Sequence, residues 1–250
     1  MRNQNGTMPQ KAQNTLSGTG NGGGSIPSPD VARYILWEAV PNESLDNFLA
    51  TNDVIGGNGG VFTVPPTANS NPALRMQSQE AANDFVEGAA QIWPDRRVTF
   101  KTACYAGYYT LPDFAGPAVT AALGIVDGGL ADGCWFGFVK NAGADTLSNW
   151  IFNCSSGGVV TAVDTGIPVS PGAVPSNTSP IVNGHRYELE FTLENGVATA
   201  LIDGEIAAVI NTNIPTGVVL FPYLIIATST TPAGNAYLTV EYVYVENATP

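Results

Sequence analysis

The fold is decided by one stretch of the sequence, Tyr187-Glu188-Leu189-Glu190-Phe191-Thr192-Leu193-Glu194. Large apolar residues occupy its odd-numbered positions and polar residues its even-numbered positions. Because successive side chains of a β-strand point to opposite faces, this pattern predicts a strand with one face on a core and the other in water. Asn195-Gly196 follows at once, and this pair readily takes the positive φ angles of a type I′ turn. We therefore predict a β-hairpin, with residues 197–202 as the partner strand.

Other segments of the chain also show patterns typical of strands and tight turns. Asp203-Gly204 supplies a second tight turn, so residues 205–210 are predicted to complete a three-stranded meander. The stretch Tyr237–Val245 has apolar residues on both faces, which is typical of a strand well inside a sheet. Further short strands are predicted at 34–37, 73–77, 84–87, 97–102, 134–140, 150–154 and 159–163. These spacings predict an all-β protein with antiparallel sheets.

The composition agrees with many short strands joined by turns. The 250 residues include 28 Gly and 18 Pro, and this length is common for a β-sandwich of one domain. Residues 1–30 are rich in Gln, Asn, Gly, Ser and Thr and contain few large apolar side chains, so they cannot offset the entropy of ordering alone. Two interpretations stay open for them, a disordered tail and an assembly arm that orders against a neighbouring subunit. We divide the chain into a flexible N-terminal arm, 1–30, and a β-sandwich, 31–250.

Charge and hydropathy exclude two classes of partner. The formal net charge is -12, whereas binding to a phosphate backbone needs clustered Lys and Arg. We therefore expect no nucleic-acid partner. No apolar run of 18 residues occurs, and the N-terminus has no apolar segment of the kind found in signal peptides, so we also expect no membrane span and no secretion signal.

The three cysteines are Cys104, Cys134 and Cys154. They include no C-x-x-C pair, and an odd number cannot all pair within one chain. We predict buried thiols and no disulfide scaffold.

A family resemblance is visible in several of these segments together. They are Asp164–Ile167, Tyr187–Leu193, Ile202-Asp203-Gly204, Phe221–Leu224 and Val240–Val245. As a pattern of strands and turns over about residues 73 to 246, they resemble concanavalin A-like or laminin G-like domains, including versions found in bacteriophage particles. The resemblance implies an antiparallel jelly-roll β-sandwich, here with an extended N-terminal arm. Because that architecture includes lectins, glycoside hydrolases and virion proteins, the fold alone does not choose a function.

Candidate catalytic groups are few. His185 is the only histidine, which argues against Ser-His-Asp, Cys-His and zinc hydrolase mechanisms, and we interpret it as an exposed turn residue. Asp164-Thr165-Gly166 resembles the aspartic protease signature, but it occurs once, so a strand-end turn is the better interpretation.

Glu188, Glu190 and Glu194 share one face of a predicted strand, and retaining glycosidases need two neighbouring carboxyl groups. Family 16-like glycoside hydrolases have the strand motif Glu-x-Asp-x-x-Glu. This chain has Glu-x-Glu-x-x-x-Glu and so departs from it in the central residue and in the final spacing. A solvated polar strand face is the simpler interpretation.

Two segments share some features with cofactor or metal sites. Gly18–Gly23 matches G-x-G-x-x-G without the flanking strand and helix of a dinucleotide site, so it is interpreted as linker. Asp127–Asp132 lacks the ligand spacing of an EF-hand and is interpreted as a turn. We expect no catalytic residues, no cofactor and no metal.

Aromatic residues indicate a binding role. Tyr105, Tyr108, Tyr109 and Phe114 lie in a stretch with Gly and Pro, where their rings could contact a glycan or a protein partner. A second group is interpreted as core because it lies in strand-like runs: Trp135, Phe136, Phe138 and Trp150.

These observations lead to a function hypothesis. We expect a non-enzymatic virion structural protein, a decoration or cement subunit that binds the capsid surface and stabilises it. Its partners would be the major capsid protein and neighbouring copies of itself. The alternative is a lectin-like receptor-binding or tail-associated module that binds carbohydrate through the loop around Tyr108. A family 16-like glycosidase using Glu188 and Glu190 is the third hypothesis.

Overall fold

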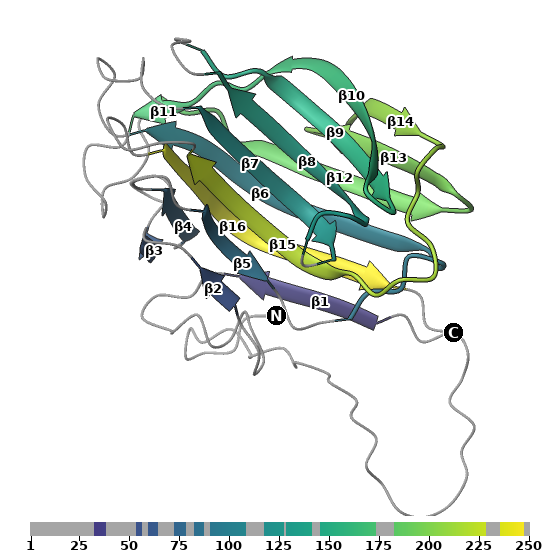
Figure 1. Cartoon of the computed structure of the whole chain (residues 1–250). Helices are drawn as coiled ribbons and strands as arrows, with labels where there is room; N and C mark the ends of the chain where they lie inside the picture. The colour runs from purple at the N-terminus through teal and green to yellow at the C-terminus, as the bar shows by residue number, and fades with distance from the viewer. Residues whose placement is uncertain are drawn as a thin grey trace, which may run out of the picture.

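The computed structural model of the chain describes residues 33–38, 54–56, 60–64, 73–78, 83–87, 91–108, 118–127, 129–141, 146–173, 183–228 and 236–247. Over these residues the regular structure is β-strand, and two curled sheets pack face to face (Figure 1). The predicted all-β, antiparallel jelly-roll sandwich is confirmed. The described part of the chain contains no helix that could cross a membrane. The predicted arm 1–30, with Gly18–Gly23, lies outside the described residues.

One layer of the sandwich is a nine-stranded sheet. Seven of its strands follow one another in the order β14 (Glu205–Ile210), β13 (Val197–Ile202), β12 (Tyr187–Glu194), β6 (Val98–Tyr108), β16 (Ala236–Asn247), β4 (Ala73–Ser78) and β3 (Gly60–Val64). Two more join this row, β1 (Arg33–Glu38) on β16 and β11 (Gly172–Ala173) on β6. β16 pairs along its whole length with β6, so the predicted interior position of the 237–245 strand is confirmed.

The other layer is a seven-stranded sheet. Its order is β10 (Val159–Pro168), β9 (Asn149–Ser156), β8 (Gly133–Lys140), β7 (Val119–Val126), β15 (Phe221–Thr228), β5 (Asn83–Glu87) and β2 (Val54–Gly56). In Figure 1 this layer lies in front of the nine-stranded sheet, and β10 and β14 lie at the same side of the sandwich. Sheet edges that come together in this way form the narrow side of a sandwich.

The two predicted tight turns are present. Asn195 and Gly196 have φ angles of 52° and 74°, and Asp203 and Gly204 have φ angles of 52° and 85°. Positive φ at both central residues matches the right-handed twist of the strands that such turns join. The meander β12–β13–β14 is therefore confirmed, with one irregularity, a shift of register between Ala200 and Leu201 opposite β14.

The core lies between the sheets, where the inward-facing residues of both meet. Phe191 of β12 stacks on Phe100 of β6 with ring centroids 5.0 Å apart, and it also contacts Phe136 and Phe152 from the facing sheet. Phe136, Phe138 and Trp150 are buried, as predicted. Trp135 differs, because the alternation of β8 turns it to the outer face of the seven-stranded sheet, where it packs against a separate apolar cluster.

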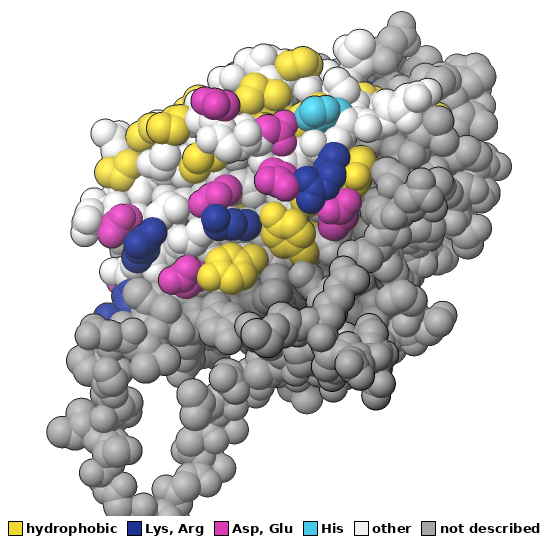
Figure 2. Space-filling model, turned by 180° about the vertical axis from the view of Figure 1, so that it is seen from behind, with side chains coloured by type: hydrophobic (Ala, Val, Ile, Leu, Met, Phe, Trp, Pro, Cys, Tyr) yellow, Lys and Arg dark blue, Asp and Glu magenta, His cyan; other side chains and the backbone are white. Residues whose placement is uncertain are grey.

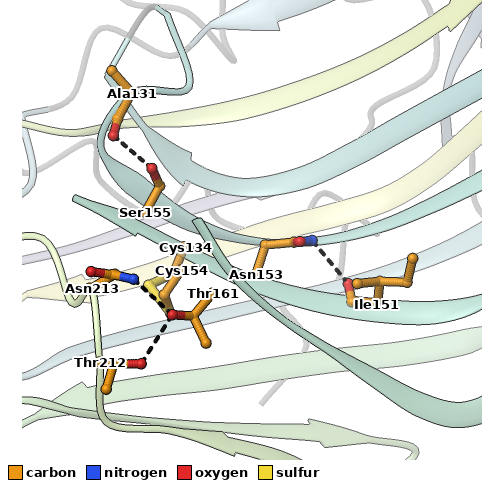
Figure 3. The surroundings of a disulfide bond; sticks show 9 residues. All are labelled: Ala131, Cys134, Ile151, Asn153, Cys154, Ser155, Thr161, Thr212 and Asn213. Atoms are coloured by element: carbon orange, nitrogen blue, oxygen red, sulfur yellow. Dashed lines mark hydrogen bonds between the residues drawn. A yellow bond between two sulfur atoms is a disulfide. The ribbon is translucent and has the colours of Figure 1, made fainter. Parts of the chain in front are cut away.

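The prediction of three free thiols is wrong for two of the cysteines. Cys134 of β8 and Cys154 of β9 are directly opposite each other, with Cα atoms 4.3 Å apart, and they form a disulfide (Figure 3). Sequence spacing did not reveal this pair because strand register, not distance along the chain, brings the two residues together. Cys104 is a buried free thiol, as predicted, and burial raises its pKa.

The surroundings of the disulfide also join the two sheets. Thr161 of β10 is the register partner of Cys154, and its hydroxyl accepts a hydrogen bond of 2.8 Å from Asn213 (Figure 3). The Thr161 hydroxyl also pairs with the hydroxyl of Thr212 at 2.9 Å. Since Thr212 and Asn213 follow β14, these bonds tie the edge of the seven-stranded sheet to the edge of the nine-stranded sheet.

Candidate functional site

The outer face of the nine-stranded sheet brings charged and aromatic side chains together. Glu190 of β12 is the register partner of Lys101 of β6, and Lys101 is the partner of Tyr244 of β16. Figure 2 views this face and shows Lys and Arg side chains interleaved with Asp and Glu and with hydrophobic side chains. The face therefore combines hydrogen-bonding groups with ring surfaces across three adjacent strands.

A groove of about 430 Å³ lies on this face. Such a volume falls in the range of sites that hold a small molecule or part of a polymer. Its lining comes from β6, β12, β16 and the residue before β6: Arg97, Thr99, Lys101, Glu190, Tyr242, Tyr244 and Glu246. Tyr242 and Tyr244 lie at i and i+2 of one strand, so both point to the same side.

Most charges in and beside the groove are paired. Lys101 Nζ lies 2.9 Å from Glu190 Oε2, and the hydroxyl of Tyr244 donates to Glu246 Oε2 at 3.0 Å. These pairs fix the direction of donors and acceptors along the groove before any ligand arrives.

Arg186 joins two strands next to the groove. Its Nη1 donates to Glu188 Oε1 at 2.7 Å, while its Nε and Nη2 lie 2.9 and 2.8 Å from Glu241 Oε2. Partial burial of Arg186 disfavours the charged form, but the hydrogen bonds to both glutamates outweigh that effect and raise its pKa. The guanidinium thus stays charged and links β12 to β16 across β6.

Two tyrosines beside this cluster have altered acidity. Burial, together with Glu241, raises the pKa of Tyr105 to about 12, and the Tyr105 hydroxyl donates to Glu241 Oε1 at 3.2 Å. Burial and the negative charge of Glu188 raise the pKa of Tyr242. Both phenols therefore stay neutral donors throughout the physiological range.

The predicted aromatic contact group is only partly described. Tyr105 is 5% exposed and packs with Tyr237, so its ring is not open to a ligand in this structure. The side chain of Tyr108, and Tyr109 and Phe114 altogether, lie outside the described residues. The hypothesis of a binding loop therefore rests on those three residues and stays a prediction.

Apart from Glu190, which the sequence analysis named as a candidate carboxylate, the groove residues were missed, although a signal exists. Arg97, Thr99 and Lys101 alternate with apolar residues, and so do Tyr242, Tyr244 and Glu246. Each run is the outward face of a strand, but only the pairing of β6 with β16 places them side by side.

The glutamates of β12 behave as the simpler interpretation predicted. Glu188 and Glu194 are exposed, and Glu190 is half-buried, on the polar face of the strand. Two of them meet cations, Glu188 with Arg186 and Glu190 with Lys101.

The other candidate groups form local structural contacts. His185 is exposed, as predicted, in the segment that leads into β12, and its Nε2 lies 3.0 Å from Asp203 Oδ2. Asp164 accepts hydrogen bonds from Gly166 and Asn149, which lower its pKa, and it lies at an irregularity inside β10 instead of at a strand end.

The turn after β7 also has no free carboxylates. Asp127 accepts from the backbone of Asp132, and Asp132 accepts from the backbone of Gly157. Within the described residues no cluster of three or more His, Cys, Asp or Glu side chains suits a metal ion.

The sequence matches no protein-family model and no curated protein. Solved structures share the fold. The Crh5 transglycosylase, in its apo form, is 14% identical over 87% of this chain and 85% of its own, with a TM-score of 0.56. A glycosidic hydrolase in its native form is 12% identical over 88% of this chain and 99% of its own, with a TM-score of 0.52. A β-glucanase from Bacillus licheniformis is 14% identical over 86% of this chain and 97% of its own, with a TM-score of 0.48.

At these identities the first two likenesses show the fold alone. They agree with the jelly-roll sandwich that the resemblance implied.

Proposed function

We propose that this protein is a non-catalytic carbohydrate-binding protein that holds a saccharide in the groove on the nine-stranded sheet. The observation behind the proposal is the pair of rings Tyr242 and Tyr244 beside the ion pair Lys101–Glu190. Sugar rings present apolar C–H faces that pack on aromatic rings, and their hydroxyl groups both donate and accept hydrogen bonds. Rings next to fixed donors and acceptors suit that mixture better than they suit an apolar ligand.

The binding role is proposed without catalysis because of the state of the carboxylates. Glycoside hydrolysis needs one carboxyl group that holds a proton and a second carboxylate nearby. Glu188 and Glu241 both bind Arg186, and Glu190 binds Lys101. Each of these carboxylates is therefore paired with a cation, which favours the ionised form. A general acid needs the opposite, a protonated carboxyl group that can donate its proton.

The fold likeness supports a saccharide ligand. Two of these proteins, with TM-scores of 0.56 and 0.52, are a transglycosylase and a glycosidic hydrolase by name, so this architecture serves glycoside chemistry elsewhere. Fold does not imply function, and the groove residues remain the basis of the proposal.

The test is affinity electrophoresis of the purified chain in gels that contain soluble polysaccharides. We expect retardation by at least one polysaccharide and its loss in the variant Tyr242→Ala with Tyr244→Ala. Val160→Ala is the control, because Val160 is exposed on the other sheet, and it should migrate like the unchanged chain. Prolonged incubation should leave the polysaccharide chain length unchanged. Unretarded migration with every polysaccharide would reject the binding role, and shortened polysaccharide would reject its non-catalytic part.

A capsid decoration subunit is the second candidate, and a different surface supports it. Ile206 and Val209 of β14 are 69% and 57% exposed at the end of the nine-stranded sheet, and exposed apolar side chains on an acidic body suit a protein partner. In this role the protein binds the major capsid protein and neighbouring copies of itself at the capsid surface, with residues 1–30 as the assembly arm. Quantitative mass spectrometry of purified virus particles tests it, because hundreds of copies per particle are expected, and their absence rejects the role.

A further inference from the structure

One cation that lines the groove, Arg97, has no ion-pair partner among the described residues. Among the described residues Lys101 and Arg186 each meet a glutamate, and Lys140 is buried. Arg97 is exposed and lines the groove, but no carboxylate of the described residues lies within ion-pair distance of its guanidinium. In a chain with 9 Lys and Arg against 21 Asp and Glu, a cation that forms no ion pair with any described carboxylate is unusual.

The backbone that presents Arg97 is held firmly. Asn247 is 4% exposed and its side chain donates to the carbonyl oxygens of Trp93 and Arg97, at 3.1 and 3.4 Å, while it accepts from the Trp93 amide at 3.0 Å. From the other side, the Asp95 carboxylate accepts the Gly217 amide at 3.0 and 3.1 Å. The guanidinium therefore starts from a fixed point at one end of the groove, which lowers the entropy lost on binding.

We propose that the groove selects saccharides that have a carboxylate, such as uronic acid units, and that Arg97 binds this carboxylate. The inference rests on the proposed saccharide binding and adds the ligand class. The planar guanidinium offers parallel N–H donors that match a carboxylate in two hydrogen bonds, a geometry that lysine cannot reproduce. Tyr242 and Tyr244 then pack against the sugar rings, and Lys101 with Glu190 meets the hydroxyl groups.

Because the protein is acidic, recognition of a carboxylate on the saccharide depends on short-range contacts. A net charge of -12 repels polyanions at long range, so no general attraction brings an acidic saccharide to this face. Selectivity for the carboxylate must then come from the Arg97 guanidinium, which has no ion pair among the described residues, and removal of this group should remove the selectivity and leave neutral binding unchanged.

The test compares matched polysaccharides by affinity electrophoresis and titration calorimetry. Polygalacturonate is paired with its methyl-esterified form, and a panel of alginate and hyaluronate is set against neutral β-glucan and dextran. We expect acidic polysaccharides to bind about tenfold or more tightly than neutral ones, as for a hydrogen bond between two charged groups. Arg97→Ala should reduce acidic binding to the neutral level, and Arg97→Lys should recover only part of it.

Arg96→Ala is the control, because Arg96 is the exposed neighbour of Arg97 and does not line the groove. It should bind like the unchanged chain. Equal affinity for acidic and neutral polysaccharides, or unchanged acidic binding in Arg97→Ala, overturns the inference. If Tyr242→Ala still abolishes neutral binding in that case, the proposed function stands. Absence of binding to every polysaccharide rejects both.

Discussion

The outer faces of the two sheets differ in kind. On the nine-stranded sheet the outward residues include Glu190, Lys101 and Tyr244, which lie around an open groove. On the seven-stranded sheet the outward residues Val126, Tyr223 and Ile225 form an apolar cluster in which each is at most 9% exposed. Strands that are apolar on both faces belong to a covered sheet. The comparison teaches that the seven-stranded sheet is buried on both faces around β7 and β15, whereas the nine-stranded sheet leaves one face open around its groove.

The largest expected effect tests the difference in burial between the two outer faces. Ile225→Asp places a carboxylate in the covered cluster and should lower the free energy of unfolding by about 4 kcal/mol. Thr199→Asp, on the open face of the nine-stranded sheet, should cost about 1 kcal/mol or less. Urea denaturation measures both, and equal losses would mean that the two faces do not differ as described.

The second effect concerns the disulfide between Cys134 and Cys154. Both cysteines belong to the seven-stranded sheet, and the described part of the nine-stranded sheet has no disulfide. Cys134→Ala with Cys154→Ala should lower the free energy of unfolding by about 3 kcal/mol, because the 20-residue separation closes a loop of moderate length. Reducing agent should destabilise the unchanged chain by a similar amount and leave the double variant unaffected. Cys104→Ala is the control and should keep its sensitivity to reduction. A mass spectrum showing three free thiols in the native protein would contradict the bond.

The third effect tests the tie within the nine-stranded sheet. Glu241→Gln removes the charge that binds Arg186 and should cost about 1 kcal/mol, since this pair is partly exposed and solvent weakens it. Denaturation in urea measures the loss, and Glu194→Gln serves as the control because Glu194 is exposed and has no ion pair among the described residues. A loss as large as that of the disulfide variant would show that the ion pair is as important as the covalent bond.

The last effect, which is absent at neutral pH, is a dependence on alkaline pH. The pKa of Tyr105 is raised from 10.0 to about 12 in the folded protein, so between these values the unfolded chain loses this proton first. The raised pKa of Tyr105 therefore makes the free energy of unfolding fall as pH rises from about 10 to about 12. Below about pH 10 it causes no pH dependence. Tyr105→Phe should show a shallower fall over this range in urea titrations at pH 9 and pH 11.5. A fall as steep as that of the unchanged chain would assign it to other groups.

Local patterns in the sequence predicted most of the strands and two tight turns, but they did not predict β2, β3, β7 and β11. The alternation in Tyr187–Glu194 and the pair Asn195-Gly196 determine a hairpin with contacts only a few residues apart. The same alternation identified the polar face that contains Glu188 and Glu190. These features depend on neighbours in the chain, so the sequence alone predicts them.

Features that depend on strand register were not predictable in the same way. Cys134 meets Cys154, and Lys101 meets both Glu190 and Tyr244, because particular strands lie side by side. Trp135 was assigned to the core for the same reason, since a shift of one position in a strand changes the face on which a side chain lies. Alternating runs show that a strand has two unlike faces, but they do not show what lies across from each.

The position of β16 has a consequence for biosynthesis. This strand is the last of the sixteen described strands to be translated, yet it pairs with β6, β4 and β1 in the nine-stranded sheet. While the ribosome is still making it, β6 lacks a partner along one edge, and the Tyr242 and Tyr244 side of the groove does not exist. Such long-range pairing folds slowly and exposes strand edges meanwhile. A nascent chain of this protein should therefore depend on chaperones until its final strand emerges.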